Sequence, residues 1–191
     1  MAIKFRGYLN NDDQLKKIDE LQLKKLTIEW IDYLFVFLII LYPLIKSLKL
    51  LISNYNGKLL NVFLMDMVGF IIVILLMLFH EYLHAMTFSK NEDVDLWLRG
   101  FGMITHCTQM KNVKDYLYTL LLPHLLITFP FSIFVILIPT LNPLFLKMIG
   151  LVSSIIILGA INDLATIIYI IRNRKQIKYL QLSGKYMYYK K

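Results

Sequence analysis

Charged residues and cysteines are scarce in this sequence. Asp, Glu, Lys and Arg make up only 18% of the 191 residues, whereas 58% are hydrophobic and the mean hydropathy is +0.59. This composition excludes an ordinary soluble domain and indicates an integral membrane protein. Cys107 is the only cysteine, which excludes an intramolecular disulfide. The first 26 residues are charged throughout and contain no continuous apolar run, so we expect no cleavable signal peptide.

Acidic residues are the rarer charged type, which leaves a formal net charge of +8. The basic residues lie in the tails and in the connections between long apolar runs, as is usual in membrane proteins. This layout argues against a nucleic-acid partner and makes the lipid bilayer the expected surroundings.

Four apolar segments are long enough to cross a bilayer, which takes about 20 residues in a helix. We therefore predict an all-α integral membrane protein that forms a single membrane-embedded domain over residues 1–191. The predicted transmembrane helices cover residues 29–51, 60–88, 116–138 and 145–171. Pro123 and Pro130 predict interruptions in the third helix.

Lysine and arginine are distributed unevenly between the connections. The amino-terminal segment, the connection between the second and third helices, and the basic tail of residues 172–191 hold 17 of the 21 basic residues. Because basic connections tend to stay in the cytoplasm, we predict a multi-pass plasma-membrane protein with both termini cytoplasmic.

Two segments outside the spans each allow two interpretations. Residues 13–28, within the leader 1–28, mix Leu and Ile with Lys and Asp, and form either an amphipathic helix on the inner leaflet or a frayed leader. In residues 94–107, apolar and polar residues alternate around Gly100 and Gly102. This pattern predicts either a short β-hairpin or an irregular loop between the second and third helices.

Three polar side chains of metal-binding type stand in the second apolar segment, in LMLFHEYLHAMTF at residues 76–88. His80 and His84 are one helical turn apart, so both imidazoles can reach one Zn²⁺ ion. Glu81 lies beside the first histidine, where it can act as a base without binding the metal. Random placement would give this H-E-x-x-H pattern with a probability of about 0.002. Ionisable residues at membrane depth also cost about 2.5 to 3.5 kcal/mol each, which favours a functional role.

A catalytic zinc keeps three protein ligands, so a third ligand is expected. At a rise of 1.5 Å per residue, His80 and His84 lie roughly 9 to 15 Å inside the membrane, and Asp163 and His124 both lie about 13 Å inside. We favour Asp163, because an unpaired carboxylate is costly at this depth. His124 is the alternative third ligand, or else a residue that supports the ligands or contacts the substrate.

Asn162 stands beside the favoured third ligand in the fourth helix. It either joins helices by hydrogen bonds, as we expect of Ser153 and Ser154, or contacts the substrate backbone or its developing oxyanion.

Taken together, these motifs resemble a known family. HEYLHA in a membrane helix, GAINDL in a later helix, and HC and LLLPH between them are similar to the small bacterial zincin peptidases, distant relatives of the site-2 intramembrane proteases. The resemblance covers about residues 60–171 and implies that His80, His84 and Asp163 bind zinc and that Glu81 is the base. Site-2 proteases usually have a glycine after this aspartate, whereas this chain has a leucine there.

The expected function is zinc-dependent intramembrane proteolysis, with a membrane protein or peptide as the substrate. Residues 94–107 would hold the unwound substrate extended by β-addition. Two other classes fit part of the pattern: a non-catalytic protein with a structural zinc, such as an immunity or assembly factor, and a different membrane metallohydrolase, such as a lipid-modifying one. Glu81 argues against a structural zinc, because such a site needs no base.

Overall fold

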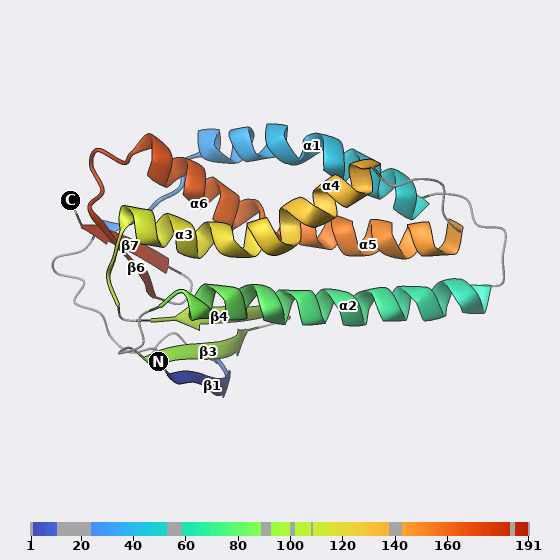
Figure 1. Ribbon diagram of the computed structural model, residues 1–191, viewed down its shortest axis with the longest axis horizontal. Helices are drawn as coiled ribbons and strands as arrows, with labels where there is room; N and C mark the ends of the chain where they lie inside the picture. Colours follow the sequence, from blue (N-terminus) through green and yellow to red (C-terminus); the bar gives the residue numbers. More distant parts are fainter. Residues whose placement is uncertain are drawn as a thin grey trace.

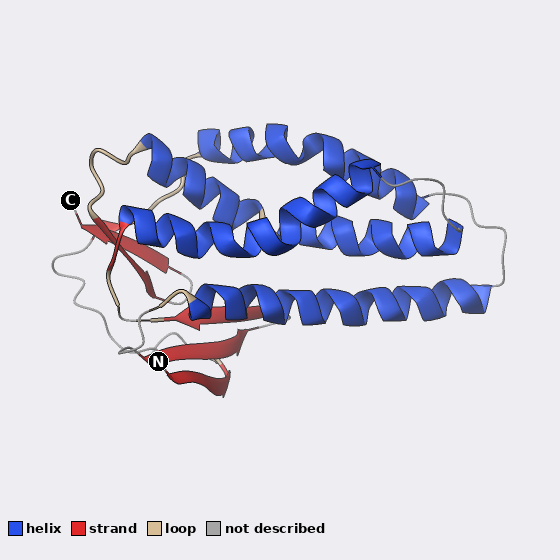
Figure 2. Ribbon diagram, in the orientation of Figure 1, coloured by secondary structure: helices blue, strands red, loops and turns tan. Residues whose placement is uncertain are grey.

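The computed structural model describes residues 2–10, 24–52, 59–88, 93–99, 102–107, 109–137, 143–183 and 186–190. The helices run along one long direction, and two small β-sheets lie at one end of them (Figures 1 and 2). Four helical stretches are long and apolar enough to cross a membrane, as the sequence predicts. The chain therefore has the fold of a multi-pass membrane protein.

The first two spans are α1, Trp30–Ile52, and α2, Leu59–Met86. At the start of α1, Asp32 Oδ2 accepts a hydrogen bond of 3.1 Å from the backbone N–H of Glu29. The other carboxylate oxygen of Asp32 lies 3.2 Å from Nη1 of Arg172, at the end of the fourth span. Both helices expose large apolar side chains along much of their length, which suits contact with lipid.

The third span changes its helical form in the middle. It consists of α3, Val113–Pro123, the π-helical segment η3, His124–Thr128, and α4, Phe129–Leu137. Asn112 caps α3 by accepting a hydrogen bond of 2.9 Å from the N–H of Asp115. The interruption predicted at Pro123 is confirmed, whereas Pro130 lies within α4 and does not end it. Short π-helical segments occur often at functional sites.

The fourth span is predicted as one helix but consists of two. α5, Pro143–Gly159, and α6, Ile161–Arg172, meet at Ala160, and α6 turns away from the line of α5 (Figure 1). The apolar pattern of this span gives no sign of the change in direction. One consequence is that Asp163 lies in the first turn of α6.

Helices α1 and α5 approach each other closely at Gly150. A Cβ atom there would lie 2.5 Å from the backbone N of Leu51 and 2.7 Å from the backbone O of Ser47. One turn later, Ser154 Oγ donates a hydrogen bond of 3.0 Å to Ser47 Oγ. Small residues and hydroxyl hydrogen bonds are usual where membrane helices pack. Ser153 is also buried but has no hydrogen bond to the described residues.

Gly150→Ala is expected to lower the thermal unfolding midpoint in detergent. The added methyl group would meet the backbone of α1, which cannot rotate away, so the two helices must separate at a cost of about 1 to 3 kcal/mol. Gly159→Ala is the matched control, because a Cβ atom at Gly159 meets no heavy atom within 4 Å. Equal midpoints for the two variants would contradict the close packing at Gly150.

The first sheet lies beside the carboxyl-terminal half of α2. Its strands are β1, Ala2–Tyr8, β3, Asp93–Arg99, and β4, Gly102–His106, in the order β1-β3-β4. β3 and β4 pair antiparallel, so the hairpin predicted in residues 94–107 is confirmed. β1 pairs in parallel with β3, a contact that no local pattern in the sequence predicts.

The second sheet joins the segment before α1 to the carboxyl-terminal tail, and it lies at the same end of the molecule as the first sheet (Figure 1). Its strands are β2, Lys24–Lys25, β5, Lys111–Asn112, β6, Tyr179–Ser183, and β7, Tyr186–Lys190, in the order β2-β7-β6-β5. Most of the amphipathic helix considered for residues 13–28 lies outside the described residues. From Lys24 onward that segment forms a short strand followed by non-helical backbone.

Candidate metal centre

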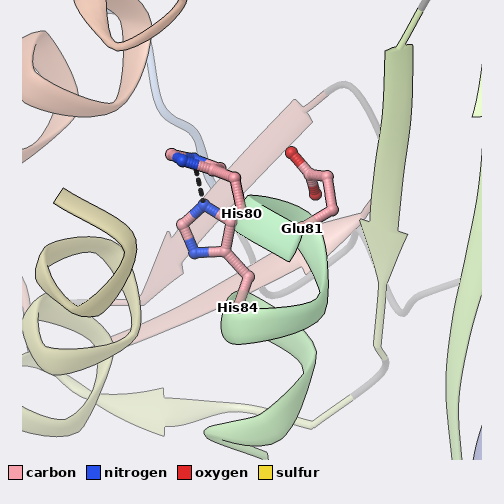
Figure 3. A group of neighbouring side chains, drawn as sticks. All are labelled: His80, Glu81 and His84. Carbon is pink, nitrogen blue, oxygen red and sulfur yellow. Dashed lines mark hydrogen bonds between the residues drawn. The ribbon is translucent and has the colours of Figure 1, made fainter. Parts of the chain in front are cut away.

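Helix α2 carries His80 and His84 one turn apart, with their rings next to each other (Figure 3). Their Nε2 atoms are 3.1 Å apart, and the ring planes lie edge to face. His84 is buried and His80 is half-buried. Two imidazole nitrogens at this distance repel through their lone pairs unless a proton or a cation lies between or beside them.

Asp163 completes a triangle of donor atoms from α6. Its Oδ2 lies 3.1 Å from Nε2 of His80 and 3.3 Å from Nε2 of His84. Ligand atoms at 2.0 to 2.1 Å from a tetrahedral zinc are separated by about 3.3 Å. Two imidazoles and a carboxylate at these distances therefore fit Zn²⁺ in both donor type and spacing.

His124 approaches the same atoms from η3. It is fully buried, and its Nε2 lies 3.6 Å from Asp163 Oδ2. Its Nδ1 lies 3.0 Å from Thr128 Oγ1, whereas its Nε2 has no hydrogen bond to any residue in the described part of the chain. His80, His124 and Asp163 have donor atoms close enough to form a metal-binding group of their own. The structure thus brings both candidate third ligands together, and the carboxylate oxygen lies nearest to both motif histidines.

The second nitrogen of His84 is also held in place. His84 Nδ1 donates a hydrogen bond of 2.8 Å to the backbone O of Thr119 in α3. A histidine that donates from Nδ1 has its Nε2 lone pair free for a metal, and such a bond also fixes the ring orientation. Nothing in the sequence pattern marks Thr119 for this role.

Lys111 connects the end of α2 to α3 by hydrogen bonds close to His84. Its Nζ donates to Thr119 Oγ1 at 2.6 Å, to Thr87 Oγ1 at 2.9 Å and to the backbone O of Thr87 at 2.8 Å. The ammonium group also lies 3.9 Å from the centre of the Phe88 ring. Burial lowers the pKa of Lys111 to about 8. In the sequence, Lys111 stands out only as one of the basic residues between the second and third spans, because its partners lie on other elements.

Glu81 points away from the two imidazoles, on the neighbouring side of the same helical turn (Figure 3). Its carboxylate still lies close enough to His80 and His84 to belong to one group of possible ligands. Thr105 in β4 donates to Glu81 Oε2 at 2.9 Å and to the backbone O of Glu81 at 3.2 Å. The hairpin therefore holds the predicted base in one orientation. The alternating sequence pattern predicts the hairpin, but it does not predict that Thr105 lies against Glu81 of α2.

Thr105→Val is expected to lower turnover by roughly tenfold while zinc stays bound, because the valine keeps the volume but leaves the Glu81 carboxylate without its donor. Thr105→Ser should restore most of the rate, since it returns the hydroxyl. The measurement is turnover and zinc content of the two purified variants. An unchanged rate in Thr105→Val would show that Glu81 does not depend on this contact.

A cavity of about 460 Å³ opens beside the donor atoms. Its polar wall contains His80, Glu81, Asn162 and Asp163, and the rest of its lining is apolar. The apolar part consists of Leu76, Met77, Met103, Ile127, Ile155, Ile156, Leu158, Gly159 and Ala160. A substrate in this cavity would therefore have direct access to the predicted base and to two of the predicted ligands.

Asn162 has features of both roles considered for it. Its Oδ1 accepts a hydrogen bond of 3.3 Å from the hydroxyl of Tyr33, which joins α6 to α1. The residue also lines the cavity and is exposed. Its oxygen already accepts one hydrogen bond, whereas no hydrogen bond of its NH₂ group is seen among the described residues, so the NH₂ group is the more available to a substrate.

A family model described as "Putative zincin peptidase" matches residues 73–178, which is more than half of the chain. The chain belongs to this family. The matched region contains the motif of α2, the β3–β4 hairpin, η3 and α6, so every predicted site residue lies inside it. Family membership suggests a zinc metallopeptidase. No match was found among curated proteins or among solved structures.

Proposed function

We propose that the protein is a zinc-dependent intramembrane protease that hydrolyses peptide bonds in membrane proteins or membrane-associated peptides. The observation that carries the proposal is the triangle of His80, His84 and Asp163 donor atoms, with edges of 3.1 to 3.3 Å, next to the Glu81 carboxylate. These groups lie on helices that can cross a membrane, and the cavity next to them is large enough for a peptide segment.

In this proposal, His80, His84 and Asp163 hold the zinc ion. When bound, zinc supplies Lewis-acid polarisation of the scissile carbonyl and makes the attacking water more acidic. Glu81 takes the proton from that water and passes it to the leaving amine nitrogen, so that it returns to its carboxylate form. The hydroxyl of Thr105 keeps the Glu81 carboxylate directed toward the cavity that Glu81 lines.

In the proposed mechanism, His124 and Asn162 neither bind the metal nor transfer the proton. The Nε2 atom of His124 lies 3.6 Å from Asp163 Oδ2, where an N–H group steadies the carboxylate or a negatively charged oxygen near it. If Thr128 donates to Nδ1, that N–H is on Nε2. The NH₂ group of Asn162 is assigned to a carbonyl of the substrate backbone, while the oxygen of the same amide accepts a hydrogen bond from Tyr33.

The orientation follows from the distribution of charge. Both termini and both sheets lie at the same end of the molecule. In the sequence, 17 of the 21 lysines and arginines stand before the first span, between the second span and residue 115, or from residue 172 onward. We assign that end to the cytoplasm, on the basis of the excess of basic residues. Water would then reach the site from the cytoplasmic side.

Strand β4 offers a way to hold the substrate extended. In the described part of the chain, β4 is the last strand of its sheet and pairs only with β3. Thr105 within β4 touches Glu81, so a substrate strand added to this edge would pass beside the base. A structural zinc would need neither an oriented carboxylate nor an adjoining cavity, which favours the protease over the non-catalytic alternative.

The test uses purified protein in lipid nanodiscs, incubated with a total membrane-protein fraction. New peptide amino termini are identified by mass spectrometry, with and without prior removal of zinc by a chelator. We expect new termini within or next to membrane-spanning segments, only in the zinc-loaded sample. Identical sets of termini with and without zinc would contradict a metal-dependent protease.

A further inference from the structure

We infer that the cavity beside Glu81 is a subsite for a bulky apolar side chain next to the cleaved bond, and that Gly159 sets the size of the side chain it accepts. This inference rests on the proposed protease function, because it assigns the cavity to the substrate of that reaction. It goes further by naming a preference and the residue that controls it.

The first argument is the composition of the cavity wall. Its polar side chains are those of His80, Glu81, Asn162 and Asp163, which come from α2 and α6. The other side chains of the described lining are hydrocarbon or thioether groups, for example those of Met103 in β4, Ile127 in η3 and Leu158 in α5. Binding sites for organic ligands typically combine about 300 to 1,000 Å³ of mostly apolar volume with a few converging polar groups, and a cavity of about 460 Å³ fits this description.

The second argument is that the cavity wall offers few groups that could pair with a charged substrate side chain. Among the described residues, the cavity lining includes no lysine or arginine, and its carboxylates are assigned to the metal and to proton transfer. The one neutral polar side chain, that of Asn162, already accepts a hydrogen bond from Tyr33 and is assigned to the substrate backbone. A charged substrate side chain in the apolar part would therefore lose its hydration without gaining a partner, which is strongly unfavourable. A leucine-like or phenylalanine-like side chain gains affinity there by leaving water.

The third argument is the position of Gly159, the last residue of α5. This residue lines the cavity, and a Cβ atom added to it would meet no heavy atom within 4 Å. Its backbone does not adopt a positive φ, so the local conformation does not require glycine. A larger side chain at this position would extend into open space that includes the cavity. We conclude that the absence of a side chain at Gly159 keeps the subsite wide.

The experiment measures binding and not turnover. Zinc-loaded Glu81→Gln protein in nanodiscs is titrated with three hydroxamates, which chelate zinc through the same group. They are acetohydroxamate, which has almost no side chain, 4-methylpentanohydroxamate, which has a leucine-like chain, and succinic monohydroxamate, which has a carboxylate at its end. The readout is the ratio of each Kd to that of acetohydroxamate, measured within one variant. Gly159→Ala, Gly159→Val and Gly159→Leu form a graded series.

With glycine at 159, the leucine-like hydroxamate is expected to bind about ten- to a hundredfold more tightly than acetohydroxamate, and the carboxylate form no more tightly than acetohydroxamate. The advantage should fall stepwise from Gly159→Ala to Gly159→Leu as the added side chain fills the cavity. A double variant, His80→Ala with His84→Ala, removes the zinc and measures uptake of the apolar compound by lipid alone.

Two results would overturn the inference. One is a ratio near one with glycine at 159, and the other is a large ratio that Gly159→Leu leaves unchanged. If acetohydroxamate itself does not bind to zinc-loaded protein, the metal site of the proposed function is wrong, and the subsite loses its basis with it. The acetohydroxamate titration therefore separates failure of the metal site from failure of the subsite.

Discussion

Glu81→Gln should nearly abolish peptide-bond hydrolysis in the purified protein while zinc remains bound in the amount found in the unchanged chain. Glutamine has the same shape as glutamate and can still accept the hydrogen bond from Thr105, but it cannot take a proton from water at neutral pH. General acid–base catalysis contributes about 10² to 10⁴ in rate, so a loss of this size is expected. The measurement pairs release of new amino termini with metal analysis of the same sample.

Glu29→Gln is the matched control for this experiment. The same substitution is made at an exposed carboxylate that pairs with Arg172 at the start of α1, away from the cavity. It should leave both turnover and zinc content unchanged. Retained turnover in Glu81→Gln would rule out the mechanism proposed above, and loss of zinc from that variant would make Glu81 a ligand instead of a base.

Asp163→Ala should remove most of the zinc as well as the activity. The carboxylate oxygen is the atom that lies within 3.3 Å of both motif histidine nitrogens, and two imidazoles alone hold zinc weakly. Loss of a residue that only hydrogen-bonds to a ligand typically lowers metal affinity by about tenfold to a hundredfold, so loss of the ligand itself should lower zinc affinity by at least as much. Zinc per protein is measured after dialysis against a weak chelator.

His124→Ala is the companion to Asp163→Ala. In this variant zinc should stay bound and activity should fall only in part, because His124 Nε2 lies 3.6 Å from the carboxylate oxygen and is assigned no metal bond. The reverse ranking, with zinc lost from His124→Ala and kept by Asp163→Ala, would move the third ligand to η3. In that case the π-helical segment that follows Pro123 would be the element that delivers the ligand.

The sequence was most informative where chemistry and periodicity coincide. The spacing of His80 and His84 predicted one helical face, and the depth argument selected Asp163 and His124, which the structure places around the same point. The four spans and the β3–β4 hairpin were also predicted, because long apolar runs and alternation around glycines are local signals.

The unpredicted features depend on partners distant in the sequence. β1 pairs with β3 across about 90 residues, and the hydroxyl of Thr105 reaches Glu81 only because of how the hairpin packs on α2. The break at Ala160 is hidden because residues on both sides of it are equally apolar. Lys111 resembles any loop lysine in the sequence, and its role follows from the positions of Thr87 and Thr119.

The central claim is that two histidines and one aspartate hold a zinc ion beside Glu81, and X-ray absorption spectroscopy at the zinc edge tests it most directly. For protein purified without added metal and restored to one zinc per chain, we predict two imidazole ligands and otherwise oxygen scatterers, all at about 2.0 to 2.2 Å. In Asp163→Ala the spectrum should change or the zinc should be lost. A third imidazole, a sulfur ligand at about 2.3 Å, or a chain that binds no zinc would contradict the account.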